Sequence, residues 1–558
     1  MIELSCALLL ASSPTLAAPP PAPQITPEAN VVAAADWPQG SGPHGNWSAT
    51  GPAPPLRFSV RSGKGIRWMA PLPETGQGGI AVTADRLFVC TMAPWDPKNA
   101  LSPEDAKRFS HAIEKRAVAG KDIDAHCLDR ATGELLWTRR IESAVPSIYT
   151  YPFSDATSAS PVADATHVWF TNAGGAVTCF THDGDLVWER RFTATYEGPF
   201  NKQFEPMLVT EGTPVLVHME PFERTVEGKD EPQRWHHLVG LDALTGKELW
   251  RSDDTLTHYN APALVQTAEG PAALIARGGP HQVPERPVGV SLVQLTGPAA
   301  GKSLWRFEDP RGNHEASLQT MTSDDRYAYW LLKEPRNALV VLDIKTGEEV
   351  REISLTQGVH RTSYDAQAEA LGAQQKVNLD KGVMPARYSM IAANGHLFFQ
   401  CYALAWGKPK IGPAYSFGRI DPDSGDVEYL EVPTDLVTGE DGRRVALWRT
   451  PRSARPLNSR GEEVTGDDRC RWDGWDWVFN GSPTRVNERL YFTLASGVVY
   501  VLNSETTTFD GSAILAVNDL GQPDQVWTAN SVSYGAGTVG GELYHRTGAH
   551  LIAIGAGQ

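Results

Sequence analysis

The chain has 558 residues, of which 41% are apolar, and it contains 51 glycines, 41 prolines and 17 tryptophans. This composition favours many turns and aromatic packing over long helices. The formal net charge of −16 argues against nucleic acid or an anionic membrane surface as a partner, because both attract clustered Lys and Arg. No segment beyond the amino terminus has 18 apolar residues in succession, so no transmembrane helix is predicted.

The first 18 residues contain a short apolar run followed by small residues, as at the end of a secretory signal, although no Lys or Arg precedes the run. We expect a signal-like leader over residues 1–18 and a secreted or periplasmic protein, with an unstructured tail as the alternative. A Pro-rich amino-terminal segment, residues 19–62, follows. Residues 63–558 are predicted to form one folded domain.

A β-strand that includes a tryptophan recurs along this domain. It occurs first as "GKGIRWMAPLP" at 63–73, and then as "TGELLW" at 132–137, "DGDLVW" at 183–188, "TGKELW" at 245–250 and "AGKSLW" at 300–305. Each later copy completes a set of β-rich runs separated by turns that contain Asn, Asp or Gly. The repetition predicts an all-β fold of four-stranded antiparallel units, each of which is one blade of a β-propeller.

The first strand has no preceding partners in its own unit. Residues 535–556, "GAGTVGGELYHRTGAHLIAIGA", supply three strands, and residues 63–73 supply the missing fourth. The two ends should therefore pair and close a ring of eight blades, which covers two sheet edges that would otherwise be exposed. The recurring tryptophans are predicted to pack between neighbouring blades, as large flat side chains with one N–H donor.

The order of these repeats resembles the pyrroloquinoline-quinone-like (PQQ-like) propeller family, which includes quinoprotein alcohol dehydrogenases and an outer-membrane assembly lipoprotein. The segment "DWPQGSGPHGNW" at 36–47 is similar to the opening of secreted quinoprotein-like repeat proteins that mostly have no assigned reaction. The resemblance covers roughly residues 36–558. It implies the fold and leaves the chemistry open.

The resemblance also implies a cofactor that can be tested against the sequence. Quinoprotein alcohol dehydrogenases resemble one another in having two adjacent cysteines over the quinone, a tryptophan beneath it, and carboxylate and amide ligands for calcium. No two cysteines of this chain are adjacent, and no calcium-binding set is recognisable by motif. PQQ with calcium is therefore disfavoured, no other cofactor is predicted, and no metal site is predicted.

Long insertions are expected on one face of the ring, whereas tight turns such as "LTGK" and "KTGE" occupy the other face. Loops elaborated on one side of a rigid scaffold commonly form binding surfaces. The insertions are residues 92–124, 219–235, 278–289, 354–386, 403–415 and 432–479.

Segments just before the innermost strands should surround the mouth of a central funnel, and they are rich in Tyr, Asn, His and charged residues. Such side chains stack on sugar rings, bind hydroxyls and transfer protons. The candidate catalytic residues are His258, His314, Tyr259, Glu315 and Arg387. The candidate ligand-binding residues are Tyr149, Tyr151, Asp155, Tyr196, Asn201, Asn260, Tyr388, Trp475, Asn480 and Tyr534.

Three functions are open on this basis. The favoured prediction is a protein that binds, and in one version also cleaves, a carbohydrate-type or other small ligand at the funnel. The first alternative is a noncatalytic scaffold for a protein partner, and the second is a PQQ-dependent dehydrogenase. Whether the protein is an enzyme is left open by the sequence.

Overall fold

The structure is a computed structural model. It describes residues 36–94, 96, 119–143, 145, 147–148, 155–194, 205–210, 212–225, 233–256, 260–277, 288–311, 320–333, 335–365, 368, 370–379, 382–385, 389–403, 414–432, 434–438, 444–448, 482–493, 498–520, 536–548 and 550–555. Within these ranges a 3-10 turn at Gly511–Ala513 is the sole helical element, and no helix is long and apolar enough to cross a membrane.

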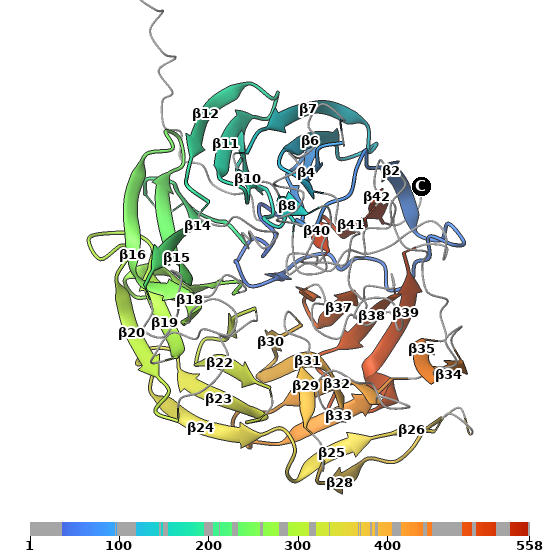
Figure 1. Cartoon of the computed structure of the whole chain (residues 1–558). Coiled ribbons are helices and arrows are strands. Elements are labelled where there is room, and N and C mark those ends of the chain that lie inside the picture. Colours follow the sequence, from blue (N-terminus) through green and yellow to red (C-terminus); the bar gives the residue numbers. More distant parts are fainter. Residues whose placement is uncertain are drawn as a thin grey trace, which may run out of the picture.

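Four-stranded antiparallel sheets follow one another along the chain and are arranged around a common centre (Figure 1). The first sheet consists of β3 (Ala81–Val82), β4 (Arg86–Met92), β6 (Ile123–Asp129) and β7 (Leu135–Ile141). The second consists of β9 (Val162–Ala163), β10 (His167–Asn172), β11 (Ala176–Thr181) and β12 (Leu186–Arg191).

The third and fourth sets are joined in one continuous sheet by a single pairing, Leu256 with Arg277. The third consists of β13 (Met207–Val209), β14 (Val215–Arg224), β15 (Gln233–Asp242) and β16 (Glu248–Leu256). The fourth consists of β17 (Ala263–Thr267), β18 (Gly270–Arg277), β19 (Gly289–Gln294) and β20 (Ser303–Glu308).

The remaining sets complete the arrangement. The fifth consists of β21 (Thr322–Ser323), β22 (Tyr327–Leu332), β23 (Ala338–Asp343) and β24 (Glu349–Ser354). The sixth consists of β30 (Ile391–Ala393), β31 (His396–Ala403), β32 (Ala414–Ile420) and β33 (Val427–Glu431). The seventh consists of β36 (Thr484–Val486), β37 (Arg489–Thr493), β38 (Val498–Asn503) and β39 (Ile514–Asp519), with β1 (Ser48–Ala49) parallel to β36.

The last sheet joins the two ends of the described chain. It consists of β40 (Gly537–Val539), β41 (Glu542–Arg546), β42 (His550–Ile554) and β2 (Ile66–Pro71). Strand β2 is antiparallel to β42, with Met69 opposite Ile552 and Pro71 opposite His550 (Figure 1). The predicted pairing of residues 63–73 with the carboxyl-terminal strands is therefore present, and the predicted all-β fold of four-stranded antiparallel sheets is confirmed.

Burial differs between the middle and outer strands of each sheet. In the first sheet, residues Leu87–Met92 of β4 are all buried, because the sheet packs against neighbours on both faces. The outer strand β7 is instead mostly exposed, with Leu135 and Leu136 exposed and only Trp137 and Ile141 buried. The middle strands therefore form the core, and the outer strands face solvent on one side.

The recurring tryptophans pack onto the next sheet, as predicted. The Trp137 Nε1 donates to the His182 carbonyl at 2.8 Å, and its ring lies against Gly184 in the turn of the second sheet. Gly184 has φ +85°, so a side chain there would be strained and would also meet the ring. The same docking recurs for Trp68 on Gly133, Trp188 on Gly246 and Trp305 on Gly347.

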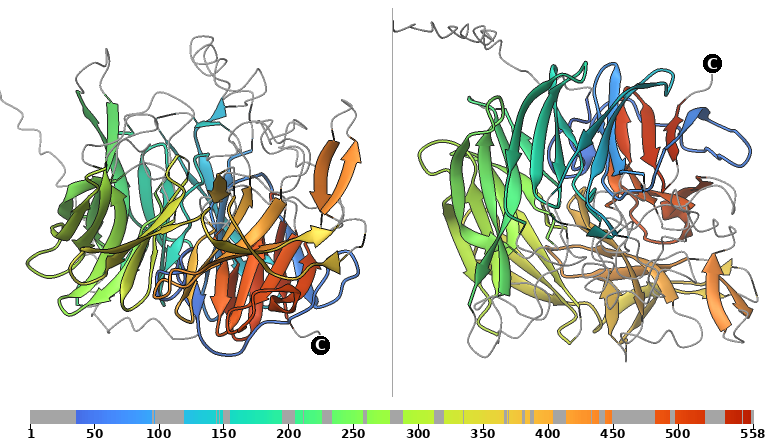
Figure 2. Two further views of the ribbon diagram at one scale, coloured as in Figure 1. Left: turned by 90° about the horizontal axis from the view of Figure 1, so that it is seen from below. Right: turned by 45° about the horizontal axis from the view of Figure 1, so that its top comes forward.

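The insertions contribute further strands. These are β5 (Ala119–Gly120), β8 (Ser147–Ile148), β25 (Val359–Thr362), β26 (Tyr364–Asp365), β27 (Ala370–Leu371), β28 (Gln375–Val377), β29 (Val383–Pro385), β34 (Thr434–Thr438) and β35 (Arg444–Trp448). The β34–β35 hairpin (orange) and the β5–β8 pair (cyan) extend toward the same side in the left view of Figure 2.

Two insertions differ from the prediction. In the 219–235 insertion, residues 219–224 and 233–235 continue β14 and β15 as paired strands. Residues 354–386 were expected to form a loop on the mouth face, but β25 pairs in parallel with the outer strand β33 and β28 pairs with β25. The outer edge of a sheet presents unpaired backbone N–H and C=O groups, and a nearby segment of the chain can pair with them as a further strand. Part of this insertion therefore widens the sixth sheet outward.

Candidate functional site

The centre of the arrangement contains a segment that precedes the first sheet, residues 36–49 (Figure 1). This central segment is hydrogen-bonded to the innermost strands of five of the four-stranded sets. The bonds join Trp37 to Val82 (2.8 Å), Pro38 to Ala163 (2.7 Å), Gln39 to Leu208 (2.8 Å), Gly45 to Leu264 (3.0 Å) and Trp47 to Arg485 (2.9 Å). The centre is thus packed with the protein's own chain.

Apolar packing strengthens these contacts. Trp37 and Trp47 are each 1% exposed, although both lie in a segment rich in Gly and Pro. Gly42 lies directly against the Trp37 ring and has φ +79°, while Gly45 lies against Leu264 and has φ +63°. A side chain at either glycine would clash with its neighbour and strain the backbone. The glycines of "WPQGSGPHGNW" therefore permit the close approach of this segment to the inner strands.

Most of the predicted site lies outside the described residues. This holds for all five candidate catalytic residues, His258, His314, Tyr259, Glu315 and Arg387. It also holds for the candidate ligand-binding residues Tyr149, Tyr151, Tyr196, Asn201, Tyr388, Trp475, Asn480 and Tyr534. These assignments stay predictions.

The two candidates that the structure does describe are buried and support the backbone. Asp155 is 0% exposed, and one of its carboxylate oxygens accepts hydrogen bonds from the backbone N–H (2.8 Å) and the hydroxyl of Thr157. Asn260 is also 0% exposed, and its side-chain oxygen accepts a bond from the Ala276 N–H at 3.1 Å. These contacts fix the segments before β9 and β17.

Glu205 is a buried acid that the sequence-based selection missed. It stands directly before the innermost strand β13, is 1% exposed and has φ +45°. Its carboxyl group lies beside the Ser160 hydroxyl and the central segment at Gly40. Burial raises the pKa of Glu205 to about 8, although Ser160 and the Ser41 backbone act in the opposite direction. Glu205 is thus protonated at neutral pH.

Other titratable groups near the centre are also neutral because they are buried. Burial raises the pKa of the Cys90 thiol to about 12, even though the Arg546 guanidinium acts to lower it. Burial lowers the pKa of His126 to about 4, and the charge of Arg546 lowers it further. Burial alone lowers the pKa of His545 to about 3. None of these three groups titrates near pH 7.

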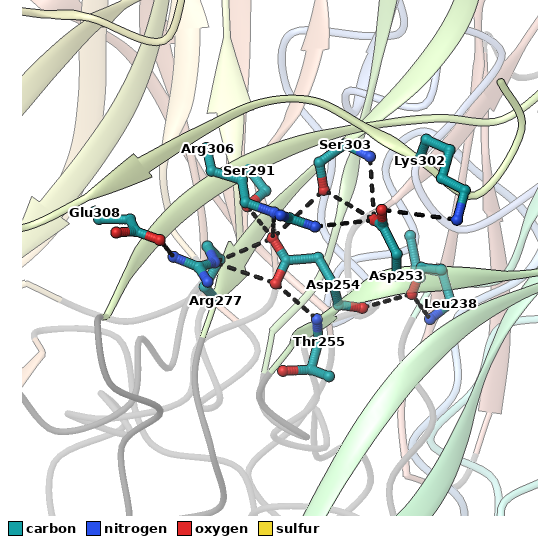
Figure 3. Close-up of polar contacts among 11 residues, drawn as sticks. Leu238, Asp253, Asp254, Thr255, Arg277, Ser291, Lys302, Ser303, Arg306 and Glu308 are labelled. Atoms are coloured by element: carbon teal, nitrogen blue, oxygen red, sulfur yellow. Dashed lines mark hydrogen bonds and ion pairs between the residues drawn. The ribbon is translucent and has the colours of Figure 1, made fainter.

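A second polar cluster lies away from the centre, where the third and fourth sets meet. Asp254 is 4% exposed and lies between Arg277 and Arg306, whose Nε atoms are 3.0 and 3.1 Å from its carboxylate (Figure 3). The Ser291 hydroxyl also donates to this carboxylate. Burial would raise the pKa of Asp254, but Ser291 and Arg277 outweigh burial and lower it. The cluster is internally paired and joins β16 to β18, β19 and β20.

The described residues do not provide the donor set that the quinone-and-calcium arrangement implies. Cys90, Cys127, Cys179 and Cys401 are buried free thiols, and no two cysteines of the chain are adjacent. Within the described ranges, no group of three His, Cys, Asp or Glu side chains is placed to hold a metal ion. We therefore derive no chemical step through PQQ or calcium.

Comparison with known families identifies part of the chain. Residues 121–279 match a family model described as "Outer membrane protein assembly factor BamB", a family of PQQ-like repeats. The match spans the second and third sets, the last two strands of the first set and the first two strands of the fourth, and it confirms the PQQ-like repeats predicted from the sequence. No curated protein matches the sequence.

Solved structures with a similar arrangement have low sequence identity. A "Europium-containing methanol dehydrogenase" is 10% identical, with a TM-score of 0.45 and coverage of 92% of this chain and 90% of that chain. Quinohemoprotein alcohol dehydrogenase ADHIIG from Pseudomonas putida HK5 is 12% identical (TM-score 0.47; 92% and 81% covered). BamB from Moraxella catarrhalis is 13% identical (TM-score 0.32; 70% and 94% covered). Scores this low carry no argument about blade number or function.

Proposed function

We propose that this chain, which carries PQQ-like repeats, forms a closed eight-bladed propeller that acts as a noncatalytic binding scaffold. The proposed ring consists of the eight four-stranded sets described above, and it closes where β2 completes the last sheet. Pairing of the two ends supports closure because β2 and β42 cover each other's edges, and neither strand is left without a partner on that side. Export from the cytoplasm is part of the same proposal and is supported by the signal-like leader.

The observation that carries the proposal is the packed centre. The central segment bridges innermost strands that are far apart in the sequence, from Val82 to Arg485. A small-molecule enzyme usually presents a concave pocket with a few convergent polar groups. Here the position at the axis is filled by buried tryptophans and backbone hydrogen bonds. The free surfaces are therefore the two faces and the rim, which suit contacts with another macromolecule.

The protonation states of three other buried groups also favour a noncatalytic role, whereas Glu205, whose pKa is about 8, is kept from contact with a ligand by its own burial at 1% exposure. General acids and bases work best when their pKa lies near the operating pH. Cys90, His126 and His545 have pKa values far from neutrality in the direction that keeps each group uncharged. Their burial contributes to packing and provides no proton donor or acceptor poised near pH 7.

Residue-specific cross-linking tests the scaffold in the cells that produce the protein. Lys121 is exposed just before β6, at the end of the first sheet where the 92–124 insertion returns. Lys247, Lys302 and Lys345 are exposed in the tight turns of the opposite face. A short amine-reactive cross-linker should join Lys121 to one recurrent partner protein. The same partner should not be cross-linked to the three turn lysines. Cross-links distributed equally over both faces, or none, would contradict a scaffold with a dedicated face.

The dehydrogenase alternative has its own test. Protein purified at full length and incubated with PQQ and calcium is expected to show no dye-linked alcohol oxidation and no spectrum of bound quinone. A known quinoprotein alcohol dehydrogenase assayed in the same buffer controls for active cofactor and dye. Turnover with stoichiometric quinone binding would overturn the proposal of a noncatalytic protein.

A further inference from the structure

A buried arginine lies where the last sheet meets the first. Arg546 is the final residue of β41 and is 3% exposed. Its Nη1 donates to the Gly78 carbonyl, in the segment just before β3, at 2.6 Å. The guanidinium is thereby held against the inner end of the first sheet.

The other edge of the same guanidinium is unused. Nε and Nη2 of Arg546 are buried and have no hydrogen-bond partner. A guanidinium is planar, and its Nε–H and one Nη–H point side by side in a fixed fork that matches the two oxygens of a carboxylate or phosphate. The orphaned pair of donors is therefore shaped for an oxyanion.

No described residue forms an ion pair with this cation, and the buried Asp155 carboxylate accepts from the Thr157 N–H and hydroxyl instead. Two other buried arginines provide a contrast, since Arg277 (7% exposed) pairs with Asp254 and Arg419 (4% exposed) pairs with Glu428. The Cys90 thiol, which Arg546 influences directly, has its pKa raised by burial to about 12 and therefore carries no charge at neutral pH. An arginine cannot lose its own charge in a protein, and an uncompensated buried charge costs several kcal/mol.

The walls beside the guanidinium are built from small groups. A Cβ at Gly76 would clash with Arg546 Nη2 and with the Thr157 hydroxyl, and a Cβ at Gly78 would meet the carbonyls of Thr157 and Ala159. Thr157 is itself fixed, because its hydroxyl accepts a hydrogen bond from the Gln77 N–H at 2.7 Å. Glycine backbone at these positions lets the polypeptide approach the cation closely.

We propose that Arg546 is the anchor of a buried oxyanion-binding site at the junction of the last and first sheets, where Nε and Nη2 bind both oxygens of a carboxylate or phosphate group. The site is independent of the scaffold function proposed above. The bound anion supplies the missing counter-charge and links β41 to the segments that precede β3 and β9. A carboxylate or phosphate gives each of the two parallel donors its own oxygen, whereas a halide must share one atom between them, so the site should favour oxyanions over chloride.

Calorimetric titration of the full-length, extensively desalted protein tests the site. Sodium phosphate and sodium acetate are titrated separately, with ionic strength held constant by sodium chloride. At least one of the two should bind saturably with a stoichiometry near one and raise the melting midpoint, because a ligand that binds the folded state stabilises it. Comparison of the two titrations identifies a phosphate-type or carboxylate-type ligand.

Two variants and a control assign the effect to Arg546. Arg546→Lys keeps a positive charge but loses the fork, so affinity should fall about tenfold or more. Gly76→Ala crowds Nη2 without changing any charge and should also weaken binding. The control Arg419→Lys removes a buried but fully paired arginine, and it should lower the melting midpoint while leaving anion affinity unchanged.

The outcomes decide the proposal even if one variant does not fold. If Arg546→Lys is unfolded by circular dichroism, Gly76→Ala and the parent protein still provide the comparison. Ion chromatography of the denatured, desalted parent detects any oxyanion that co-purifies too tightly to titrate. The proposal is wrong if the parent neither binds nor retains either anion, or if Arg546→Lys and Gly76→Ala bind it as tightly as the parent does.

Discussion

Two of the sheet junctions that contain a buried arginine differ in what lies opposite its charge. At the junction of the third and fourth sets, Arg277 meets the Asp254 carboxylate, which also binds Arg306 and Ser291 (Figure 3). At the junction of the last and first sheets, Arg546 meets a backbone carbonyl and has two unused donors. At the first junction the arginine has a direct carboxylate partner, whereas at the second Arg546 forms no ion pair with a described residue.

A third buried group shows why this difference matters. Glu205 also lacks an ion-pair partner among the described residues, but a carboxyl group can keep its proton, and burial raises the pKa of Glu205 to about 8. Arginine cannot become neutral in this way, because its guanidinium stays protonated at any pH at which proteins fold. An unpaired buried acid is therefore compatible with a purely structural role, while an unpaired buried arginine points to a bound anion.

The largest expected effect comes from removal of residues 63–73, which takes the outer strand away from the last sheet. Deletion removes the ladder between β2 and β42 and the docking of Trp68 on Gly133. The exposed edge of β42 and the lost packing should abolish a single cooperative thermal transition. The point variant Trp68→Ala, which keeps the strand, should melt between the parent and the deletion. An unchanged midpoint in the deletion would refute closure through the two ends.

Removal of Asp254 at the junction of the third and fourth sets should leave Arg277 without its direct carboxylate partner, as Arg546 is at the other junction. Asp254→Ala leaves Arg277 buried without its carboxylate, and breaking a buried ion pair in this way costs about 3–5 kcal/mol of unfolding free energy. Chemical denaturation measures the loss. The double variant Asp254→Leu with Arg277→Met should lose less, because no uncompensated charge remains. If the single and double variants are equally destabilised, charge pairing is not what stabilises this junction.

A smaller effect is expected at the tryptophan contacts that all junctions of this kind share. Trp188→Phe removes the hydrogen bond from Nε1 to the Ala243 carbonyl, 2.9 Å long, and part of the ring that packs on Gly246. The free energy of unfolding should fall by about 1–2 kcal/mol, because the smaller ring leaves a gap and one hydrogen bond is lost, while Trp169 Nε1 still donates to the same carbonyl at 2.9 Å. Phe58, which is buried but makes no such contact through a ring N–H, can be replaced by Leu as the matched control. If both variants lose the same free energy of unfolding, the indole N–H does not contribute specifically to the contact.

The smallest effect concerns the pH dependence that Glu205 imposes. Its pKa is about 8 in the folded protein and near 4.5 in the unfolded chain, so the folded state holds an extra proton between these values. The contribution of Glu205 to the free energy of unfolding should therefore be greatest below about pH 4.5, and it should fall as the pH rises toward 8. Glu205→Gln removes this contribution, which amounts to about 1 kcal/mol between pH 6 and pH 7. Parallel stability–pH curves for parent and variant would contradict the buried, protonated state.

The sequence by itself determined the strands, their grouping and the contact between the chain ends. Turn residues and alternating apolar positions are local signals, and a tryptophan recurs in the outer strand of five sets. The strand at 63–73 could be assigned to the last sheet because it lacked partners nearby. The docking of each tryptophan on the following sheet was also predictable, since a large flat side chain needs an apolar surface to cover it.

Only the tertiary structure decided what lies at the centre. The glycines and prolines of residues 36–49 predict an irregular segment, but no local pattern states that its carbonyls and amides will pair with strands as distant as β36. Glu205 and Arg546 were missed for the same reason. Each is an ordinary residue at the end or start of a strand, and its unusual state comes from burial by segments more than a hundred residues away, such as Gly40 beside Glu205 and Gly78 beside Arg546. Burial and charge compensation depend on the assembled fold, so a sequence read in one dimension cannot supply them.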